Sequence, residues 1–459
     1  MFYGRENELK KLQKAFKSKR QETLLIYGRR RIGKSELIRY SCEKSEIPMI
    51  YYECLEATEK KNLEGLSEVI SQTFNLEGIS FNGVGKALQF VFEQAKENPM
   101  ILVLDEYPYL RKKAEGMDSI LQSLIDQYRT SSQLKLILCG SYVDVMKSLL
   151  QEENPLYGRI SLSIQLRQMD YLDASKFYPG FSEEEKVQLY SVFGGVPYYC
   201  ELIDPELSVK ENIISLISGQ DARLQNEVQM YLKNELSKME NANSVFDSLA
   251  SGFSQFNEIL QSSGISSSPT LADVMNRLVE MEIVEKRFPI NKPDNKKYTK
   301  YYITDNLSLF YFRYIFRYSS QRRVMNPEVF YERYIEEDFH EHFVPDAFEK
   351  ISRQFLIRRN INGKIEPPFD LIGSYAYDDP IKKKNGQFDV VTHDPLGYKS
   401  YEVKFKSEPV SDGMIEKEIQ QVKDSPLDAY AYGFISKSGY HLSEKHNCDL
   451  YTLAELYAE

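Results

Sequence analysis

The stretch TLLIYGRRRIGKSELIRYSCEK, residues 23–44, decides the fold class of the N-terminal part of this chain. An apolar, β-leaning run over 23–27 is followed by GRRRIGKS over 28–35, and then by a segment that reads as a helix. Strand, G-x-x-x-x-G-K-S and helix in this order are the required context of a phosphate-binding loop. The alternative is an ordinary glycine-containing turn before a helix, and the two flanking elements argue against it.

Each residue type of this motif has a chemical reason. Gly28 and Gly33 let the backbone curl so that its N–H groups face phosphate oxygens, and the following helix directs its positive end at the same charge. Lys34 is expected to reach the β- and γ-phosphates, and Ser35 to offer its hydroxyl to Mg²⁺. We therefore predict ATP and Mg²⁺ as ligands, with further nucleotide contacts from the loop and the first helical turn: Arg29, Arg30, Arg31, Ile32 and Glu36.

A second part of the predicted site follows at MILVLDEYPYL, residues 100–110. A continuous apolar run is typical of a buried parallel strand, and the carboxyl end of such a strand is where an α/β sheet presents its ligands. Asp105 fits the residue that holds Mg²⁺, and Glu106 fits the base that orients the attacking water. An acidic turn after a strand is weak evidence alone, but the upstream loop strengthens it.

A third apolar strand, LKLILCG over 134–140, is expected beside the strand that ends in Asp105. Ser141 follows it directly. We predict that Ser141 lies near the γ-phosphate as a sensor, while the alternative is a helix N-cap before YVDVMKSLL. Both roles are compatible.

Length and composition bound the remaining possibilities. The chain has 459 residues, 42% hydrophobic and 27% charged, which is ordinary for a globular protein of two to four domains. No apolar run is long enough to span a membrane, no signal peptide is apparent, and the five cysteines show no metal or disulfide spacing. We expect a cytoplasmic protein without membrane contact. The net charge is −10, but residues 1–40 carry 12 Lys and Arg against 4 Asp and Glu, which suits an anionic ligand.

Several short motifs occur in a specific order: FYGRENEL at 2–9, the loop GRRRIGKS, LDEYPYL, CGSYVDVM, PLYGR at 155–159 and FGGVPYY at 193–199. Over residues 1–235 this order resembles the AAA+-related archaeal-type ATPases, a group close to the signal-transduction ATPases with numerous domains. The resemblance implies that Gly4 and Arg5 form a turn near the adenine, and that Pro197 opens a lid helix near the nucleotide. It also makes Arg159 an arginine-finger candidate, which would require a homo-oligomer if it acts in trans; a surface ion pair is the alternative.

The middle of the chain reads as helices over 183–240, expected to form a lid and a connector. From about 240 to 305 the pattern is three short helices and a hairpin, which is the outline of a winged helix, and the resemblance implies such an element after the ATPase core. DNA is the expected partner if the helix and wing contact it. The predicted recognition helix exposes Asp273, Asn276, Arg277 and Glu280 and is not notably basic, whereas the wing is. A purely structural coupler is the alternative, and a protein partner also stays open.

The last third carries a possible second active site. Asp389 lies in one predicted strand, and Glu402 and Lys404 lie two residues apart in the next, so both point to one face. A hairpin would bring Asp389 beside Glu402, and two such carboxylates can hold Mg²⁺. This arrangement resembles the PD-(D/E)xK nuclease core over about residues 340–450, with Glu349 on the preceding helix as a further metal ligand.

The nuclease pattern departs in one place: the residue before Asp389 is Phe388 and not proline, a departure that many family members tolerate. An alternating E-x-K strand also occurs in ordinary exposed hairpins. Position after this type of ATPase favours a nuclease-like fold, while cleavage and binding without cleavage both remain possible, because degenerate nuclease folds are frequent.

The sequence therefore predicts an α/β protein in four parts. These are a P-loop ATPase core with a parallel sheet (1–180), a helical lid (181–238), a winged helix with a linker helix (239–320) and a restriction-endonuclease-like α/β domain (330–459). Its predicted function is ATP hydrolysis coupled to nucleic acid, with a metal-dependent nuclease domain. The alternative is a nucleotide-dependent switch whose C-terminal domains only bind a partner.

Overall fold

The structure is a computed structural model that describes residues 2–76, 79–236, 241–379 and 384–458. The chain forms two compact units. The first contains residues 1–168 and 196–198, and the second contains residues 169–195 and 199–459. The four predicted domains divide the chain more finely than these units and stay a prediction. Among the described residues, none of the helices combines the length and the apolar character needed to span a membrane.

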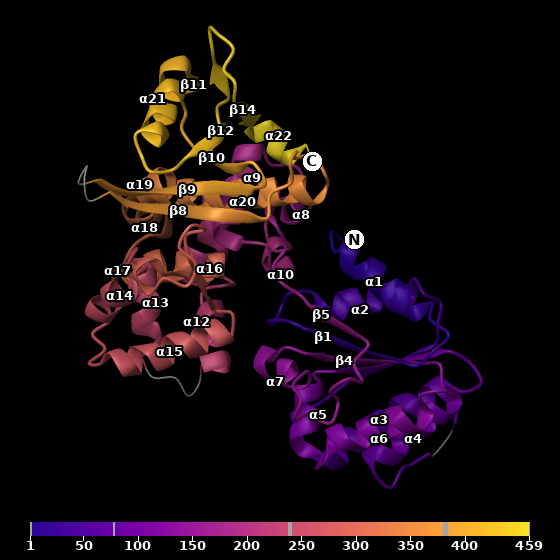
Figure 1. Ribbon diagram of the computed structural model, residues 1–459. Helices are drawn as coiled ribbons and strands as arrows, with labels where there is room; N and C mark the ends of the chain where they lie inside the picture. Colours follow the sequence, from indigo (N-terminus) through magenta and orange to yellow (C-terminus); the bar gives the residue numbers. More distant parts are fainter. Residues whose placement is uncertain (1, 77–78, 237–240, 380–383, 459) are drawn as a thin grey trace. The chain divides into compact units, whose positions relative to one another are not determined.

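The first unit is built on a five-stranded, wholly parallel sheet in the order β2-β3-β4-β1-β5 (Figure 1). Three of these strands confirm the apolar runs predicted from the sequence: β1 (Glu22–Tyr27), β3 (Met100–Asp105) and β4 (Leu134–Gly140). Strand β4 lies between β3 and β1, as expected. The sequence reading did not single out β2 (Met49–Glu53) or β5 (Leu162–Gln165).

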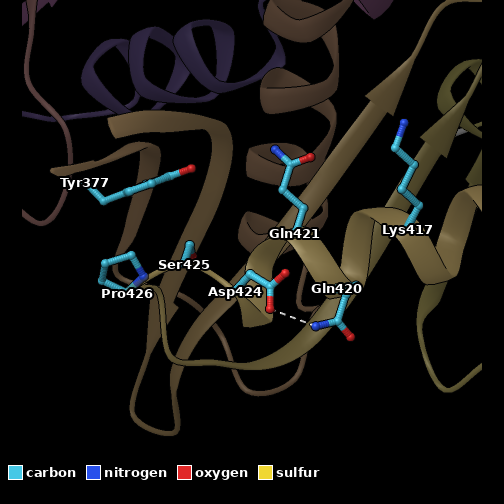
Figure 2. A pocket seen from close by; sticks show the side chains of 7 residues that line it. All are labelled: Tyr377, Lys417, Gln420, Gln421, Asp424, Ser425 and Pro426. Atoms are coloured by element: carbon cyan, nitrogen blue, oxygen red, sulfur yellow. Dashed lines mark hydrogen bonds between the residues drawn. The ribbon is translucent and has the colours of Figure 1, made fainter. Parts of the chain in front are cut away.

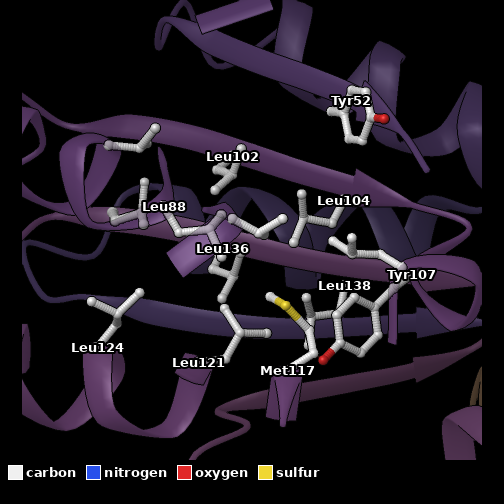
Figure 3. Close-up of a cluster of buried hydrophobic side chains, with 14 of the residues drawn as sticks. Tyr52, Leu88, Leu102, Leu104, Tyr107, Met117, Leu121, Leu124, Leu136 and Leu138 are labelled. Carbon is white, nitrogen blue, oxygen red and sulfur yellow. The ribbon is translucent and has the colours of Figure 1, made fainter. Parts of the chain in front are cut away.

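Helices cover both faces of this sheet (Figure 1). One core packs the sheet against α3, α4 and α6 through leucines such as Leu88, Leu102, Leu121 and Leu136, all fully buried (Figure 3). Burial of one such side chain contributes about 1.5–3 kcal/mol, so this face is a main source of the unit's stability. The helices are α1 (Glu6–Phe16), α2 (Lys34–Glu43), α3 (Glu59–Phe74), α4 (Val84–Gln94), α5 (Tyr107–Lys113), α6 (Met117–Tyr128) and α7 (Val143–Ser148).

The second unit begins with the helices predicted for the lid. The sequence EEEKVQLYSVF forms α9 (Glu183–Phe193), whose N-terminus is closed by a capping box between Ser182 and Glu185. The other elements of this region are α8 (Tyr171–Ser175), α10 (Pro197–Cys200), which begins in the first unit, α11 (Val209–Ile213), the π-helix η1 (Ile214–Ser218) and α12 (Glu227–Leu236).

Three helices and a hairpin follow where the sequence predicts them. They are α13 (Ala242–Ala250), α14 (Phe256–Ser262), α15 (Ser268–Glu280) and the antiparallel strands β6 (Val284–Arg287) and β7 (Lys300–Ile303), with the short 3₁₀ helix η2 (Lys296–Tyr298) in their connection. Leu271, Val274 and Leu278 are buried on one face of α15, at the three-to-four spacing of an amphipathic helix. The opposite face of α15 is exposed.

An aromatic helical segment links the hairpin to the C-terminal part. It contains α16 (Asn306–Phe310), the π-helix η3 (Tyr311–Phe316), α17 (Ser319–Val324), α18 (Pro327–Tyr334), α19 (Glu336–Asp338) and the π-helix η4 (Phe339–Phe343), and it leads into the long helix α20 (Val344–Ile361). Phe310, Tyr314 and Phe343 are buried and pack ring against ring at 4.9–5.6 Å between centroids, so the predicted buried linker helix is confirmed.

The C-terminal part is a mixed five-stranded sheet in the order β14-β12-β10-β9-β8. Its strands are β8 (Leu371–Asp379), β9 (Lys384–Asp394), β10 (Gly397–Lys404), β12 (Ala429–Ser436) and β14 (Asp449–Thr452). Strands β9 and β10 form the predicted antiparallel hairpin, and β10 pairs parallel with β12. A separate pair, β11 (Val410–Ser411) and β13 (Tyr440–His441), and the helices α21 (Asp412–Lys423) and α22 (Leu453–Tyr457) complete the unit.

The two main helices of this part lie on opposite faces of the sheet. On one face Tyr451 of β14 packs edge-on against Phe355 of α20. On the other face Tyr432 of β12 packs near Val422 of α21. Tyr451 is paired with Ile435 of β12 and therefore shares its face of the sheet. Ile435 and Tyr432 are separated by an odd number of positions along β12, so their side chains point to opposite faces. Asp389 and Glu402, two of the acidic residues predicted for the nuclease site, therefore stand on a sheet covered on both faces.

Candidate nucleotide site and C-terminal acidic centre

The phosphate-binding loop lies between β1 and α2, as the motif predicts. Gly28 and Gly33 both have positive φ, at 156° and 86°, and a side chain at Gly28 would collide with the backbone of Leu166. Pro197 lies against the other glycine, since a Cβ built on Gly33 would stand 3.6 Å from Pro197 Cγ. The loop therefore lies close to the backbone of Leu166 at its first glycine and close to the Pro197 ring at its second.

Lys34 is the first residue of α2 and is buried, with 6% of its surface exposed. Its ammonium donates to the carbonyl oxygens of Gly28 at 3.0 Å and Arg29 at 3.1 Å. The ammonium is therefore held against the first two residues of the loop. Glu36 lies exposed in the first turn of the same helix.

Ser35 and Asp105 come together although they are 70 residues apart in sequence. The Ser35 hydroxyl donates to Asp105 Oδ2 at 2.7 Å. Tyr51, on the neighbouring strand β2, donates to the same oxygen. Burial by itself raises the pKa of Asp105, but hydrogen bonds from Cys139, Tyr51 and Ser35 hold that pKa below its ordinary value. Asp105 is therefore ionised, and with the Ser35 hydroxyl it forms a donor set of the kind that Mg²⁺ takes in phosphate sites.

Glu106 and Ser141 form a second pair at the ends of β3 and β4. Both the hydroxyl of Ser141, at 2.9 Å, and its backbone N–H, at 3.2 Å, donate to Glu106 Oε2. Glu106 adopts a left-handed backbone conformation with φ 49° and ψ 42°, which is costly for a residue other than glycine. The predicted N-cap alternative for Ser141 is not seen, because Tyr142 is the N-cap residue of α7.

Arg30 and Arg31 of the loop contact different partners. Arg30 donates to the hydroxyl groups of Tyr109 at 3.1 Å and Tyr142 at 3.3 Å. Tyr109 and Tyr142 follow shortly after Glu106 and Ser141 in the chain. Arg31 has a positive φ of 66° and stacks over the ring of Tyr198 at 4.3 Å. Arg30 thus connects the loop to the segments that follow β3 and β4, and Arg31 connects it to the FGGVPYY motif at 193–199.

Arg5 supports the loop from the N-terminal side. Gly4 and Arg5 both have left-handed backbone angles, with φ 64° and 65°, which confirms a turn before α1. The Arg5 guanidinium is buried and donates to the carbonyl oxygens of Ile32 at 3.2 Å and Arg167 at 2.7 Å. The contact with adenine stays a prediction.

Arg159 forms the surface ion pair that was the alternative to a finger role. The Nε and Nη2 atoms of its guanidinium both donate to the Asp126 carboxylate on α6, and the shorter bond, from Nη2 to Oδ2, is 2.8 Å. A role in trans would require Arg159 to leave Asp126, and the finger role stays a prediction.

The predicted C-terminal residues lie on three neighbouring elements. Glu349 is on α20, Asp389 on β9, and Glu402 and Lys404 on β10. Strand β9 carries a bulge opposite Ser374. Phe388 pairs with Tyr375 and Val391 pairs with Gly373, so β9 has one residue more than β8 between these two pairs. The bulge contains Asp389, which is exposed. Bulges beside active sites re-aim a side chain in this way.

Lys404 is held between two carboxylates. Its ammonium lies 2.6 Å from Glu402 Oε1 and 2.9 Å from Glu418 Oε1 of α21. Burial raises the pKa of Glu402 despite the Lys404 contact, and Asp389 adds to this increase. Burial also raises the pKa of Glu349 to about 7, with Asp389 as the next cause. Glu349, Asp389 and Glu402 therefore share one electrostatic environment.

A pocket of about 330 Å³ lies beside α21 (Figure 2). Its lining combines the helix, the chain that follows it and one residue of β8: Lys417, Gln420, Gln421, Asp424, Ser425, Pro426 and Tyr377. Gln420 donates to Asp424 at 2.9 Å.

Sequence reasoning missed Tyr51, Glu418 and Gln387, each of which contacts a predicted site residue. Gln387 Nε2 donates to Asp389 Oδ1 at 2.7 Å. Gln387 and Asp389 stand two residues apart in one strand, a spacing that places both on one face. No comparable signal marks Tyr51 or Glu418, because only the tertiary fold brings them to the site.

The sheet order, the loop and the Ser35–Asp105 pair define a P-loop ATPase fold. A family model described as "ATPase domain predominantly from Archaea" matches residues 2–203. A curated relative, the uncharacterized protein MJECL04 of Methanocaldococcus jannaschii, is 30% identical over 82% of this chain and 82% of its own length. The chain belongs to this family of ATPases. A second model, of archaeal and bacterial proteins of unknown function, matches residues 311–422.

Two solved structures are similar in fold. The Walker-type ATPase PABY2304 of Pyrococcus abyssi superposes with a TM-score of 0.51 at 20% identity, covering 68% of this chain and 96% of that chain. The Aeropyrum pernix ORC2 protein, in ADPNP–ADP complexes, gives a TM-score of 0.47 at 12% identity, covering 67% of this chain and 91% of that chain.

Proposed function

We propose that the first unit binds ATP with Mg²⁺ and hydrolyses it. The observation that carries this proposal is the 2.7 Å hydrogen bond between Ser35 and Asp105, which joins the motif after β1 to the acidic end of β3. Lys34 binds the β- and γ-phosphates together with the N–H groups of the loop, and the bound Mg²⁺ neutralises charge on the same phosphates. Glu106, oriented by Ser141, accepts the proton of the attacking water.

The test of this proposal is ATP turnover and nucleotide binding by the full chain, with Asp105→Asn as the variant. The amide keeps the size of the side chain but removes its charge, so Mg²⁺-dependent turnover should fall at least tenfold while metal-free nucleotide binding persists. Asp144→Asn is a matched control, because Asp144 is exposed on α7. Turnover of Asp105→Asn at the wild-type rate would contradict the assignment.

For the C-terminal part, we propose a divalent-cation site formed by Glu349, Asp389 and Glu402, which hydrolyses phosphodiester bonds of nucleic acid. The support is that the three carboxylates interact electrostatically and that Lys404 stands beside Glu402. A cation bound by these carboxylates would polarise a phosphate oxygen, and Lys404 would stabilise negative charge that develops there. The alternative is a module that binds nucleic acid without cleaving it.

Mn²⁺ titration of the nucleotide-free full chain, paired with a plasmid-nicking assay, separates these alternatives. Glu402→Gln should abolish metal binding and nicking. Lys404→Gln should leave metal binding largely intact and lower the nicking rate. Metal binding without nicking would support the binding-only alternative, and absence of a binding difference between wild type and Glu402→Gln would contradict the metal site.

We propose that the three-helix and hairpin segment over 242–303 is a winged helix that couples neighbouring parts of its unit. The exposed face of α15 carries Asp273, Asn276, Arg277 and Glu280, and Arg277 pairs with Asp273 at 3.2 Å. The basic groups of this segment are on the hairpin. A gel-shift comparison in which neutralising Arg277 leaves DNA affinity unchanged would support the coupler role, whereas a strong loss would favour direct reading by α15.

A further inference from the structure

The hairpin β6–β7 docks onto the C-terminal sheet through its connecting loop. The N–H of Ile290 donates to the carbonyl oxygen of Ser374 at 2.7 Å. The Asn291 side chain both donates to the Ala376 carbonyl, at 2.9 Å, and accepts from the Ala376 N–H, at 3.1 Å. These bonds occupy backbone groups of β8, the edge strand next to β9. The docking brings one face of the hairpin towards the strand that carries Asp389.

That face of the hairpin is polar and basic. Glu285 stands opposite Tyr302, and Arg287 stands opposite Lys300. Because side chains two residues apart in a strand share a face, all four side chains lie on the same side. Lys300 on this side donates to Gln387 of β9, so this side faces the strand that carries Asp389.

A continuous chain of hydrogen bonds joins the hairpin to the centre. Lys300 Nζ donates to Gln387 Oε1 at 2.9 Å, and Gln387 Nε2 donates to Asp389 Oδ1 at 2.7 Å. The amide of Gln387 is thereby fixed in one orientation, since only its nitrogen can donate to the carboxylate and only its oxygen can accept from the ammonium. Asp389 lies in the β-bulge of β9, where the regular pairing with β8 is interrupted.

We infer that Lys300 and Gln387 are positioning residues of the C-terminal acidic centre, which orient the Asp389 carboxylate for a divalent cation. The inference rests on the proposed metal site of Glu349, Asp389 and Glu402. It adds that the β6–β7 hairpin contributes a residue to the surroundings of this site. Partners that orient a metal-binding carboxylate are typically worth about 10–100-fold in metal affinity. The role requires no contact of Lys300 with the cation.

The test measures Mn²⁺ affinity in the nucleotide-free full chain, with Asp389→Ala as the baseline for binding elsewhere. Gln387→Leu should weaken Mn²⁺ binding about 10–100-fold, and Lys300→Met should weaken it in the same direction. When Lys300→Met is added to Gln387→Leu, the Mn²⁺ affinity should not fall further, because Lys300 acts through Gln387. Lys300→Arg, which can still donate to Gln387, should restore a large part of the affinity.

Two controls separate positioning from docking. Lys297→Met removes an exposed lysine of the same connection, whose ammonium lies 3.2 Å from the Asp378 carboxylate, and should leave Mn²⁺ affinity unchanged. Asn291→Ala loosens the docking without touching the chain of hydrogen bonds. A loss with Asn291→Ala as large as with Lys300→Met, without rescue by Lys300→Arg, would overturn the positioning role.

The failures of the two proposals are distinguishable. Mn²⁺ binding that is lost in Asp389→Ala but unchanged in both Lys300→Met and Gln387→Leu would overturn this inference and leave the metal site standing. Mn²⁺ binding by wild type that does not exceed the Asp389→Ala baseline would overturn both. Circular dichroism melting of each variant shows that the compared proteins are folded.

Discussion

Ser141 donates two hydrogen bonds to one oxygen of Glu106, from its hydroxyl at 2.9 Å and from its backbone N–H at 3.2 Å. The two residues end neighbouring parallel strands, and Glu106 is held in a left-handed backbone conformation. The carboxylate assigned as the base is therefore oriented by the residue assigned as the sensor.

Ser141→Ala removes one of these two bonds and leaves the backbone donor. We expect ATP turnover to fall by about tenfold, with little change in ATP affinity, because removal of a single hydrogen bond to a charged group costs roughly 1.5–3 kcal/mol. Steady-state kinetics separates the two effects. Ser141→Thr keeps the hydroxyl and serves as the control, and a Ser141→Ala variant with wild-type kcat would show that Ser141 does not orient the base.

Lys34→Ala and Glu106→Gln should affect different steps. Loss of the ammonium at Lys34 removes the charge that binds the phosphates, so ATP affinity should fall at least tenfold. Glu106→Gln cannot accept the proton, so turnover should fall by about 10²–10⁴ while affinity persists. Fluorescent-nucleotide binding and phosphate release measure the two quantities. Lys10→Ala, at an exposed position of α1, is the control for a general loss of positive charge.

Arg30 links the phosphate-binding loop to the segments that follow Glu106 and Ser141, through Tyr109 and Tyr142. Arg30→Ala should lower kcat several-fold more than it raises the KM for ATP, because the link positions catalytic groups. Tyr109→Phe with Tyr142→Phe should reproduce the effect by removing the hydroxyl groups alone. Arg31→Ala, which removes the arginine stacked on Tyr198, is the matched comparison. Equal kinetics of the Arg30 and Arg31 variants would argue against this specific link.

Arg159 and Asp126 allow a test of the finger hypothesis. If Arg159 only stabilises its own unit, Arg159→Ala and Asp126→Ala should have similar, small effects on melting and none on turnover. If Arg159 acts in trans, only Arg159→Ala should lower turnover, and light scattering should find an oligomer in the presence of ATP. A strict monomer with full ATPase activity would exclude action in trans.

Asp338 supplies a pH-dependent contribution to the stability of the second unit. Burial opposes ionisation of this carboxyl, but hydrogen bonds from Arg313, at 2.7 Å, and Tyr314, at 2.6 Å, hold its pKa below the ordinary value. A lowered pKa stabilises the folded state above the unfolded pKa of about 3.9, and this stabilisation is lost as the pH falls through the folded value.

Asp338→Asn should therefore lower the melting temperature at pH 7, and the difference from wild type should shrink as the pH falls below about 4. Differential scanning calorimetry across this range measures both quantities. Asp273→Asn is the control, since Asp273 is an exposed partner of Arg277 on α15. A difference that grows on acidification would contradict the assignment.

The sequence by itself determined three of the five strands of the parallel sheet in the first unit and the residue types of the loop that follows β1. The apolar runs of β1, β3 and β4 are long enough to be read without structural context, and the chemistry of phosphate binding restricts Gly28, Gly33 and Lys34 to particular residue types at fixed spacing. Asp105 and Glu106 could be placed because strand ends in an α/β sheet meet at one edge. The C-terminal hairpin and its three named residues followed from strand periodicity.

Only the tertiary structure decided how these residues are supported. Tyr51 reaches Asp105 from the adjacent strand, and Arg30 turns to Tyr109 and Tyr142, because side-chain partners far apart in sequence leave no periodic trace. The bulge that holds Asp389 depends on pairing with β8, a strand that the sequence reading did not identify. The basic hairpin, for which the sequence leaves both DNA contact and a structural role open, docks on that strand and places Lys300 against Gln387. Local sequence fixes which groups a strand or loop offers, whereas the packing of distant segments fixes what those groups contact.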